Sequence, residues 1–423
     1  MAQDRPGRPS PQPRPGSPWG GRVAQAEMRA SNMGLILRHL RTHGGRSRAR
    51  LASETGLSKA TTSSLIADLA DRGLVREGAV VRGGTIGRPG QTVTLDGRGV
   101  VGVGLEISAD YAALMAVTLS GTVVRESITP LDAAHLTIGT VLDRAAAQLE
   151  RAVGSLRMAG AHVVGITVAA PGIIDYDTGK LRFAPNLGWR GVPLAAGLAE
   201  RLGPDAPPIR VENDAKLAAL AEFDRVAPQG VLDLLYLTGE VGIGAGIVSA
   251  GRLVRGHAGF SGEVGHLPLD PTMTPCTCGR RGCWETVVGL AAFLSLVADE
   301  GDSLRDPTRP LEDRLLTLAE RARAGDARVL QALTTIGDRL ALGLGILVDV
   351  LNPRMVVLGG YYAFFGEQLL PHLTAALDAR LLDEGGSAIL ASSELGLVAS
   401  ALGGALFALE DVFSDPTIVL PEA

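Results

Sequence analysis

The chain has 423 residues, of which 46% are hydrophobic and 20% are charged, and its net charge is −5. This length predicts two to four domains of about 100–200 residues each. The sequence contains no run of about 20 apolar residues and no N-terminal signal pattern, so nothing in it indicates a membrane or secreted protein. Three cysteines are too few for a disulfide scaffold of this size, which favours a reducing compartment. We therefore predict a soluble, cytoplasmic protein with no membrane among its partners.

The modest net charge hides a division of the chain into a basic and an acidic part. Residues 1–97 carry 15 Arg and Lys against 7 Asp and Glu, whereas the remainder carries 25 against 38. A basic segment joined to an acidic body excludes a single globular domain with evenly distributed charge. It indicates a nucleic-acid-binding module attached to a second domain.

The N-terminal part is predicted to hold a tail followed by three helices. Residues 1–25 predict a disordered tail, because six prolines fall within the first 18 positions and almost nothing there is apolar. The first helix follows and stops at Gly44. The second starts after Ser47, and the third starts after Ser58, both of which are candidate N-caps. Gly73 closes the third helix.

Two strand-like runs, at 74–77 and 92–95, enclose a glycine-rich loop at 83–90. Together with the three helices they predict a winged helix-turn-helix domain over residues 26–97. The alternative is a three-helix bundle for protein contacts with a merely solvated basic face. The predicted contacts to double-stranded DNA are Arg48, Ser58, Lys59, Thr61, Thr62, Ser63 and Arg88.

Residues 98–423 alternate strands and helices in the manner of an α/β fold. A meander followed by helix–strand alternation occurs twice, which predicts two lobes with a cleft near residues 213–285. The predicted elements are strands 100–107, 111–119, 123–127, 163–169, 209–212, 234–238, 245–248, 252–254 and 355–358, and helices 137–156, 194–202 and 327–351.

The three cysteines lie within eight residues, at Cys276, Cys278 and Cys283, among glycines that let the backbone turn. Three thiolates at this spacing suit tetrahedral zinc. His266 is the best candidate for the fourth ligand, and His257 is less favoured because it lies further back in the sequence. A site with three Cys and one His leaves no open position, so the zinc would be structural. The alternative is three reduced thiols without metal.

Six motifs follow one another along the chain: Ala184–Trp189, Glu212–Ala215, Gly242–Ile247, Gly262–His266, Cys276–Glu285 and Asn352–Gly360. Together they resemble the ROK family, whose members are sugar kinases and winged-helix sugar-responsive repressors. The resemblance covers about residues 30–415. It implies an actin-like, two-lobed sugar-kinase fold, zinc held by His266 and the three cysteines, and a homodimer or homotetramer. The helix-turn-helix places the chain in the repressor branch.

The resemblance also implies a site for a sugar or sugar-phosphate effector. Carboxylates and amides supply the paired donors and acceptors that vicinal hydroxyls need, and His266 would turn one ring nitrogen to zinc and the other to a hydroxyl. The alternative for Glu263 and Glu285 is a pair of solvated loop carboxylates. The implied effector residues are Asn186, Asn213, Asp214, Glu263, His266 and Glu285.

Asp214 matches the general base of the kinases, but its surroundings differ from theirs. Lys216 stands where those kinases often have Asn. The favoured interpretation is that Lys216 is a cation on the surface of a helix. The alternative is that Lys216 pairs with Asp214 or Glu212.

The first phosphate loop of the kinases, Asp-x-Gly-Gly-Thr, corresponds here to Glu106–Asp110, which lacks both glycines and the threonine. Asp110 adds a carboxylate where phosphates would lie. The glycines of the second loop, Gly242, Gly244 and Gly246, remain as a vestigial nucleotide loop. We therefore predict no enzyme activity and no ATP as cofactor.

These features predict a DNA-binding transcriptional regulator, a repressor of carbohydrate-metabolism genes. Its body would bind the effector, which changes affinity for a palindromic operator. One alternative is an ATP-dependent, glucokinase-like sugar kinase that carries a DNA-binding domain. Another is a body that serves only as a dimerisation scaffold.

Overall fold

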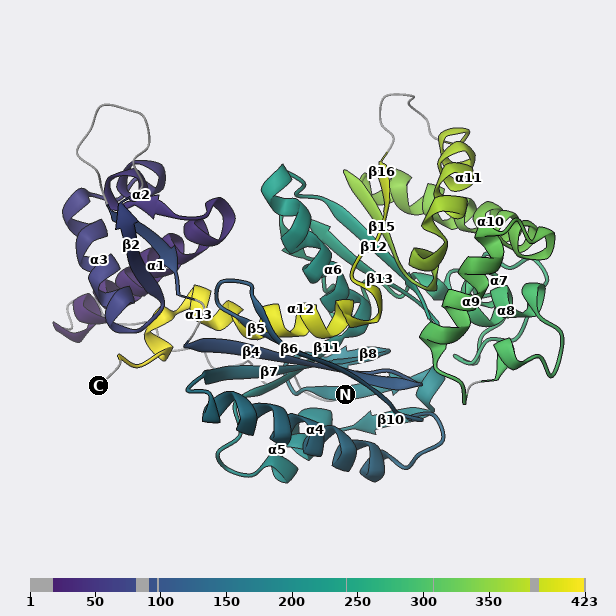
Figure 1. Ribbon diagram of the computed structural model, residues 1–423, viewed down its shortest axis with the longest axis horizontal. Coiled ribbons are helices and arrows are strands. Elements are labelled where there is room, and N and C mark those ends of the chain that lie inside the picture. Colours follow the sequence, from purple (N-terminus) through teal and green to yellow (C-terminus); the bar gives the residue numbers. More distant parts are fainter. Residues whose placement is uncertain are drawn as a thin grey trace, which may run out of the picture. The chain divides into compact units, whose positions relative to one another are not determined.

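The structure, a computed structural model, describes residues 18–80, 91–96, 99–240, 242–306, 308–380 and 388–421. The chain forms two compact units (Figure 1). Unit 1 comprises Met1–Thr94 and Asp411–Ala423, and unit 2 comprises Leu95–Glu410. Most of the predicted tail and the predicted wing loop, with Arg88, lie outside the described residues.

Unit 1 begins with three helices in a helix-turn-helix arrangement. The helices are α1 (Pro18–His43), α2 (Arg48–Thr55) and α3 (Lys59–Asp71). The hydroxyls of Ser47 and Ser58 accept hydrogen bonds from the backbone N–H groups of Arg50 and Thr61, so both serines cap helices as predicted. Gly56, at the end of α2, has a φ of 75°, which glycine adopts at low cost.

A three-stranded sheet in the order β1-β3-β2 completes this unit. Its strands are β1 (Arg46–Ser47), β2 (Val75–Val80) and β3 (Gln91–Leu95). The two strands of the predicted wing are therefore present, whereas β1 is too short to show a sequence pattern. The predicted extent of the tail is wrong in one respect, because α1 already begins at Pro18. Proline is favoured at the first position of a helix, where its missing N–H costs nothing.

The C-terminal residues 411–423 belong to unit 1, whereas the sequence analysis assigned them to the body. The ring of Phe413 is fully buried, with the Arg41 guanidinium 4.9 Å from its centre. Arg38 donates to the hydroxyl of Ser414 at 3.0 Å. Arg72 donates to the carbonyl of Val419 at 2.6 Å. The two ends of the chain thus build one unit, which local sequence patterns cannot reveal.

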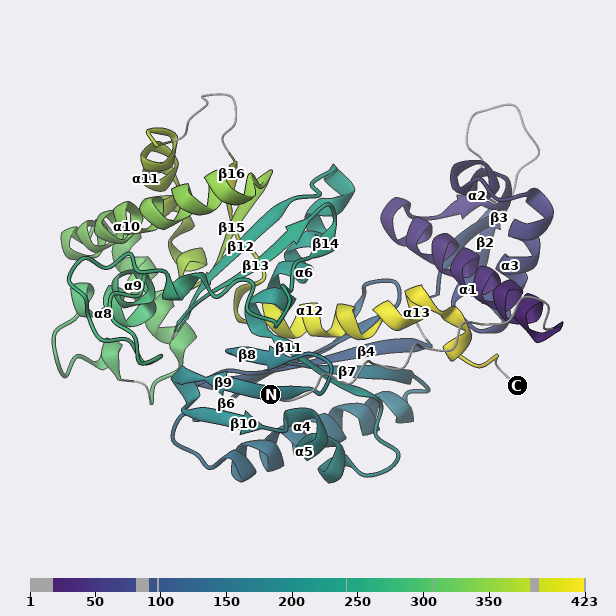
Figure 2. The same ribbon diagram turned by 180° about the vertical axis from the view of Figure 1, so that it is seen from behind.

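The first lobe of unit 2 is built on a five-stranded sheet in the order β11-β7-β4-β5-β6. β4, β5 and β6 form the predicted antiparallel meander, and β7 and β11 add parallel strands. Figures 1 and 2 show α4 and α5 together on one face of this sheet and α12 on the other. The elements are β4 (Val100–Ile107), β5 (Tyr111–Thr118), β6 (Val123–Pro130), α4 (Ile138–Met158), β7 (His162–Ala170), α5 (Leu194–Leu202) and β11 (Ile209–Asn213), with a smaller sheet of β8 (Ile173–Asp175), β9 (Lys180–Ala184) and β10 (Trp189–Val192).

The second lobe repeats this plan with a sheet in the order β14-β13-β12-β15-β16. β12 pairs antiparallel with β13 and parallel with β15. The sequence analysis predicted this repetition. The elements are α6 (Asp214–Val226), β12 (Leu234–Gly239), β13 (Ile243–Ser249), β14 (Arg252–Leu253), α7 (Glu285–Val288), α8 (Leu290–Val297), α9 (Leu311–Arg323), α10 (Ala327–Leu351), β15 (Met355–Gly360), α11 (Gly366–Asp378), β16 (Ile389–Ser392) and α12 (Ala399–Ala408). Helix α13 (Glu410–Ser414) follows, and all of it except Glu410 belongs to unit 1.

Helices α6 and α12 pack against each other between the two sheets, α12 on the first sheet and α6 on the second. Their close approach depends on glycine: a Cβ at Gly403 of α12 would lie 1.8 Å from the carbonyl oxygen of Leu217 in α6. Residues Gly396–Ser414 are long and apolar enough to cross a membrane, contrary to the sequence prediction. However, 67% of that apolar window is buried, as in a core helix.

Candidate functional site

A cavity that opens to solvent is lined by residues from both lobes of unit 2. It collects all six residues that the family resemblance implied for an effector, together with Gly242 and Gly244. These residues come from several elements and loops, and the first and last of them, Asn186 and Glu285, are 99 positions apart in the chain. The six are Asn186, Asn213, Asp214, Glu263, His266 and Glu285. Their role in holding an effector stays a prediction.

Two of these residues stand at the junction of β11 and α6. The side-chain oxygen of Asn213 accepts from the backbone N–H of Lys216 at 3.1 Å, and its amide donates to the carbonyl of Gly172 at 3.1 Å. A side-chain oxygen of Asp214 accepts from the backbone N–H of Ala215 at 2.7 Å. Burial raises the pKa of Asp214, although this hydrogen bond opposes the shift. The side chains of Asn213 and Asp214 therefore occupy the backbone donors that begin α6.

The interpretation of Lys216 as a helix-surface cation is wrong. The residue is 2% exposed, and its ammonium group donates to the carbonyl of Gly259 at 2.7 Å. Burial lowers its pKa, while the carboxylate of Glu212 opposes that shift. Glu212 itself forms an ion pair with Arg255 at 2.6 Å. The error arose because α6 packs against neighbours on more than one face, so that even its polar positions are enclosed.

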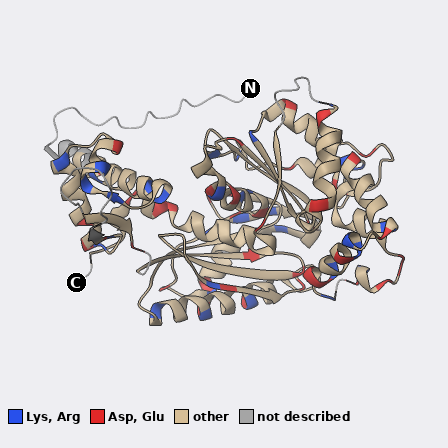
Figure 3. Cartoon of the chain, turned by 45° about the horizontal axis from the view of Figure 1, so that its top comes forward, with Lys and Arg blue, Asp and Glu red and all other residues tan. Residues whose placement is uncertain are grey.

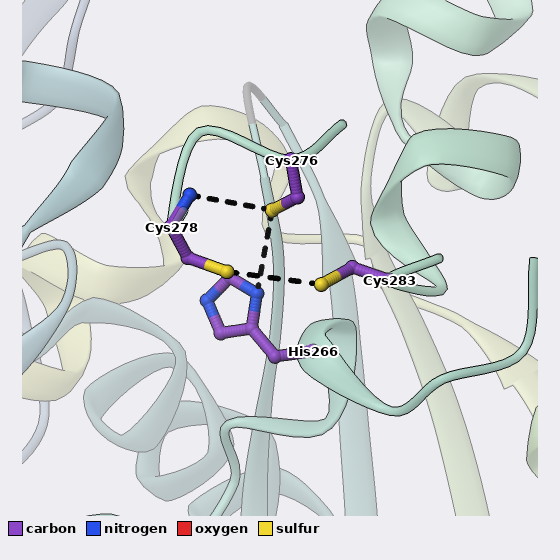
Figure 4. Close-up of side chains that lie close together, drawn as sticks. All are labelled: His266, Cys276, Cys278 and Cys283. Atoms are coloured by element: carbon purple, nitrogen blue, oxygen red, sulfur yellow. Dashed lines mark hydrogen bonds between the residues drawn. The ribbon is translucent and has the colours of Figure 1, made fainter. Parts of the chain in front are cut away.

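The four predicted zinc ligands form one cluster (Figure 4). The sulfurs of Cys278 and Cys283 are 3.7 Å apart, and the sulfur of Cys276 lies 3.8 Å from Nδ1 of His266. Around a tetrahedral Zn²⁺, bonds of about 2.3 Å to sulfur and about 2.1 Å to nitrogen give separations of about 3.6–3.8 Å between ligand atoms. The donor set and its spacing therefore fit zinc. His257 is exposed and is not part of the cluster.

His266 lies between this cluster and the cavity. Its Nδ1 is 3.6 Å from a carboxylate oxygen of Glu285, and its Nε2 is 4.0 Å from a carboxylate oxygen of Glu263. Burial lowers the pKa of His266, which favours the neutral imidazole that binds metal ions. One ring nitrogen thus faces the thiols, as Figure 4 shows, and the other faces the cavity.

Glu263 and Glu285 are not the solvated loop carboxylates of the alternative interpretation. Their side chains are 25% and 10% exposed. Burial, together with the neighbouring Asp214, raises the pKa of Glu263 to about 7. Glu285 accepts a hydrogen bond from the Cys276 thiol, with 2.7 Å between oxygen and sulfur. Both residues therefore belong to an enclosed, acidic wall of the cavity.

The stretch that corresponds to the first phosphate loop of the kinases is occupied by a network of carboxylates. The hydroxyl of Ser108 donates to Glu240 at 3.2 Å. The hydroxyl of Tyr111 lies 3.2 Å from Glu106 and 3.4 Å from Glu240. Burial raises the pKa of Glu106, and burial together with Asp214 raises that of Glu240 to about 7. Ser108 and Glu240 both line the cavity.

The sequence analysis placed the added carboxylate of this stretch on Asp110, which is wrong. Asp110 forms an ion pair with Arg314 of α9, at 3.6 Å, and does not line the cavity. Glu240, by contrast, lines the cavity and accepts the hydrogen bond of Ser108. The sequence held a signal for it, because a Glu among the glycines of the second loop is unusual chemistry for a phosphate site.

The glycines of that second loop have packing reasons of their own. A Cβ at Gly244 would lie 2.9 Å from Cβ of Ala215, and one at Gly246 would lie 2.3 Å from Cβ of Ala219. Both distances are too short, so β13 needs glycine to let α6 approach. These two glycines therefore carry no information about nucleotide binding.

The predicted DNA contacts of unit 1 differ in their accessibility. Lys59 and Thr61 are exposed on α3, whereas Thr62 is fully buried and its hydroxyl donates to the carbonyl of Ser58. Thr62 is thus a core residue, and its prediction as a DNA contact is wrong, because the helical period turns it inward. Ser63 is partly exposed. The exposed face also carries Ala60, Ser64 and Ala67, which the predicted set omitted.

Two other predicted DNA contacts are already engaged. Ser58 caps α3 and lies 2.8 Å from the hydroxyl of Thr61. Arg48 forms an ion pair with Glu77 of β2, so a contact with phosphate would compete with this pair. Figure 3 shows further Lys and Arg residues along the helices of unit 1. Of the predicted set on α3, Lys59 and Thr61 are exposed and Ser63 is partly exposed, and their contact with DNA stays a prediction.

Comparison with known families matches residues 102–411 to the ROK family. The chain belongs to the ROK family. Residues 34–84 match the MarR family. The predicted family and fold class are therefore confirmed: an N-terminal helix-turn-helix region followed by a ROK body of the sugar-kinase type.

Two relatives are named for regulation. The chain is 29% identical to the xylose repressor of Bacillus subtilis, covering 90% of this chain and 95% of that protein. It is 27% identical to the DNA-binding transcriptional dual regulator NagC of Escherichia coli, covering 83% and 85%.

Two solved structures share the fold. A ROK family transcriptional regulator, described as a homolog of the E. coli MLC protein, superposes with a TM-score of 0.74 at 23% identity, covering 92% of this chain and 97% of that one. A ROK family glucokinase from Streptomyces griseus, in complex with glucose and AMPPNP, gives 0.62 at 25% identity. The match covers 73% of this chain and 99% of the glucokinase chain.

Proposed function

We propose that this protein is a transcriptional repressor of sugar-metabolism genes whose ROK body binds a sugar or sugar-phosphate effector that changes operator affinity. The observation that carries the proposal is the presence in one chain of a helix-turn-helix with exposed polar residues on α3 and a cavity lined by carboxylates and amides that suit sugar hydroxyls. The repressor names of relatives that span most of the chain support it. The effector would bind one state of the protein better and so shift its population.

The effector would be held by carboxylates and amides on both sides of the cavity. Asn186, Glu263 and Glu285 offer acceptors and donors to sugar hydroxyls, and Asp214 faces them from the start of α6. Because these groups come from both lobes, a sugar that contacts all of them favours a closed arrangement of the lobes. That closure is the conformational change that we infer the effector stabilises.

Zinc would be held by His266, Cys276, Cys278 and Cys283 as a structural ion, which the spacing of the ligand atoms supports. Bound zinc would join four side chains and so stabilise a loop that has little regular structure. In this chain the loop carries Glu285 and His266 into the cavity, so the metal would position effector-binding side chains.

We infer that the protein is not an enzyme and does not use ATP. Glu240 and Glu106, held by Ser108 and Tyr111, occupy the region where the kinases bind phosphate, and carboxylates there oppose anionic phosphates. The second candidate is a sugar kinase with a DNA-binding domain, favoured by Asp214, which lines the cavity as a kinase base would. Incubation with ATP, Mg²⁺ and a panel of hexoses separates the two, because steady turnover would establish the kinase.

The DNA partner is expected to be a palindromic double-stranded operator read by a homodimer or homotetramer in the cytoplasm. Lys59, Thr61 and Ser63 of α3 would enter the major groove. Arg88 remains a proposed contact from the wing. Selection from a random double-stranded DNA library, followed by fluorescence anisotropy with and without sugars, tests the proposal. A sugar-independent affinity, or a selected pool without an inverted repeat, would contradict it.

A further inference from the structure

The charges that line the cavity bear on the choice between a sugar and a sugar-phosphate effector. Four carboxylates face into it: Asp214, Glu240, Glu263 and Glu285. Among the described residues, no Lys or Arg lines it, and His266 is the one basic side chain there. A phosphate monoester carries about −1.5 to −2 charges near pH 7. Above pH 7, where Glu240 and Glu263 are mostly ionised, it would meet side chains of its own sign.

Three cations of unit 2 are engaged with groups outside the cavity. Lys216 donates its ammonium group to the carbonyl of Gly259, and Arg255 forms an ion pair with Glu212. Arg314 forms an ion pair with Asp110 of the β4–β5 turn. None of the three lines the cavity.

The backbone donors that could bind an anion are also occupied. The N-terminus of α6 would otherwise suit phosphate, because its first N–H groups lack partners within the helix. Here Asp214 accepts from the N–H of Ala215 and Asn213 accepts from that of Lys216. The helix terminus is thus closed by the protein's own side chains.

Glu240 engages the hydroxyl donors at the same end of the cavity. Ser108 donates its hydroxyl to the Glu240 carboxylate, and the Tyr111 hydroxyl lies within reach of it. These hydroxyls are the donors that a phosphate in this region would need. A carboxylate thus stands where a phosphate would stand, and it uses the same partners.

We propose that the effector is an uncharged, unphosphorylated sugar and that Glu240 is the residue that rejects a phosphorylated one. This inference rests on the proposed function, because it specifies the ligand class of the same cavity. The cavity distinguishes the two classes by charge at the Asp214–Glu240 end rather than by size.

The Arg280 guanidinium, which lies near the cavity, would favour a phosphorylated sugar. Arg280 is exposed and lines a hollow that adjoins the cavity and shares Glu263 and His266 with it. Arg280 is held beside the thiol of Cys278, whose interaction raises the pKa of the guanidinium. We infer that it belongs to the metal-binding loop. The experiment includes a variant of it for this reason.

The test compares matched sugar pairs with the full-length, zinc-loaded protein at about pH 8. The probes are glucose, N-acetylglucosamine and xylose against glucose 6-phosphate, glucose 1-phosphate and N-acetylglucosamine 6-phosphate, by calorimetry and thermal shift. We expect at least one uncharged sugar to bind and its phosphorylated partner to bind at least about tenfold more weakly. Equal or tighter binding of the phosphorylated partner overturns the inference, and loss of that binding in Arg280→Ala would locate the phosphate at Arg280.

The role of Glu240 is tested by the ratio of the two affinities, which a purely structural role would leave unchanged. Glu240→Gln keeps the shape and removes the charge, so the preference for the uncharged partner should fall by about tenfold. Asp110→Asn is the matched control, since Asp110 is an adjacent carboxylate outside the cavity, and its ratio should equal that of the wild type. An unchanged ratio in Glu240→Gln overturns the role of Glu240. If no probe binds and none releases DNA, the proposed sugar effector itself fails, and this inference fails with it.

Discussion

Glu285 accepts a hydrogen bond from Cys276, with 2.7 Å between carboxylate oxygen and sulfur, and so joins the thiol cluster to the effector cavity. The two residues are nine positions apart, at opposite ends of the cysteine loop. The contact therefore makes the position of Glu285 depend on the geometry of the cysteine loop.

Replacing Cys276 by Ser should lower the zinc content of the purified protein by at least about half and abolish sugar binding, because the loop loses a ligand that positions Glu285. Metal analysis and thermal shift with the best sugar measure the two effects. Thr277→Ser, in the same loop, is the control and should keep full zinc. A full zinc content in the Cys276 variant would show that the ligand set is wrong.

Asp214→Asn should remove the effect of sugar on DNA binding. The amide keeps an oxygen to accept from Ala215 but loses the charge that a sugar hydroxyl would meet, at a cost of about 1.5–3 kcal/mol in sugar affinity. Affinity for DNA without sugar should stay within about twofold of the wild type. Anisotropy titrations of operator DNA across sugar concentrations measure both. Asp177→Asn, on an exposed turn, is the control, and an unaltered dose response in Asp214→Asn would remove Asp214 from the site.

The sequence predicted those parts of the molecule that depend on neighbours in the chain. The strand at Val100–Ile107 and the helix at Leu194–Leu202 have the predicted bounds, because each has a strong period and clear ends. The zinc cluster was predictable for the same reason, since its three thiols are close in sequence. The N-caps at Ser47 and Ser58 likewise follow from local chemistry.

The errors concern contacts between distant segments. Glu240 was overlooked because its partners Ser108 and Tyr111 stand about 130 positions earlier. Burial of Lys216 depends on how α6 packs, and burial of Thr62 depends on the packing of α3 in unit 1. The burial of Lys216 leaves no pattern in the local sequence, whereas the helical spacing of Thr62 with Leu65 and Leu69 was a signal that the prediction did not use.

Lys59→Ala should weaken binding to all DNA sequences alike. A surface lysine at the start of α3 would neutralise one phosphate, so the slope of log affinity against log salt should fall by about one. Thr61→Ala should instead change the preferred base at one position of each half-site, at about 1–3 kcal/mol. Lys180→Ala, on β9 of unit 2, is the control for charge. A salt slope equal to that of the wild type in Lys59→Ala would contradict the assignment.

Phe413→Ala should destabilise unit 1, although the residue stands near the C-terminus. The ring is fully buried and stacks with the Arg41 guanidinium, and removing a buried Phe side chain costs about 3–5 kcal/mol. Limited proteolysis should therefore cut the N-terminal helices faster, and DNA binding should weaken. Leu420→Ala is a matched control, because Leu420 is 79% exposed. Faster cleavage confined to unit 2 would show that the C-terminal segment does not stabilise the helix-turn-helix.

Glu240 should make the stability of unit 2 fall as the pH rises. Burial, with Asp214 nearby, raises its pKa from 4.5 to about 7 in the folded protein. Between those values the folded state keeps a proton that the unfolded state has lost. The free energy of unfolding therefore decreases as the pH rises from about 4.5 to 7 and stays low above it. The loss is about 1–3 kcal/mol, and the raised pKa values of Glu106 and Glu263 act in the same direction.

Glu240→Gln removes the carboxyl group that retains a proton in the folded protein at intermediate pH. Denaturant unfolding at about pH 5 and pH 8 should show a smaller loss of stability in this variant than in the wild type, by about 1–3 kcal/mol. Glu150→Gln, on the exposed face of α4, should retain the loss seen in the wild type. Equal pH dependence in Glu240→Gln and the wild type would mean that the Glu240 carboxyl is already ionised at low pH in the folded protein. That result would contradict its enclosure by Ser108 and Tyr111.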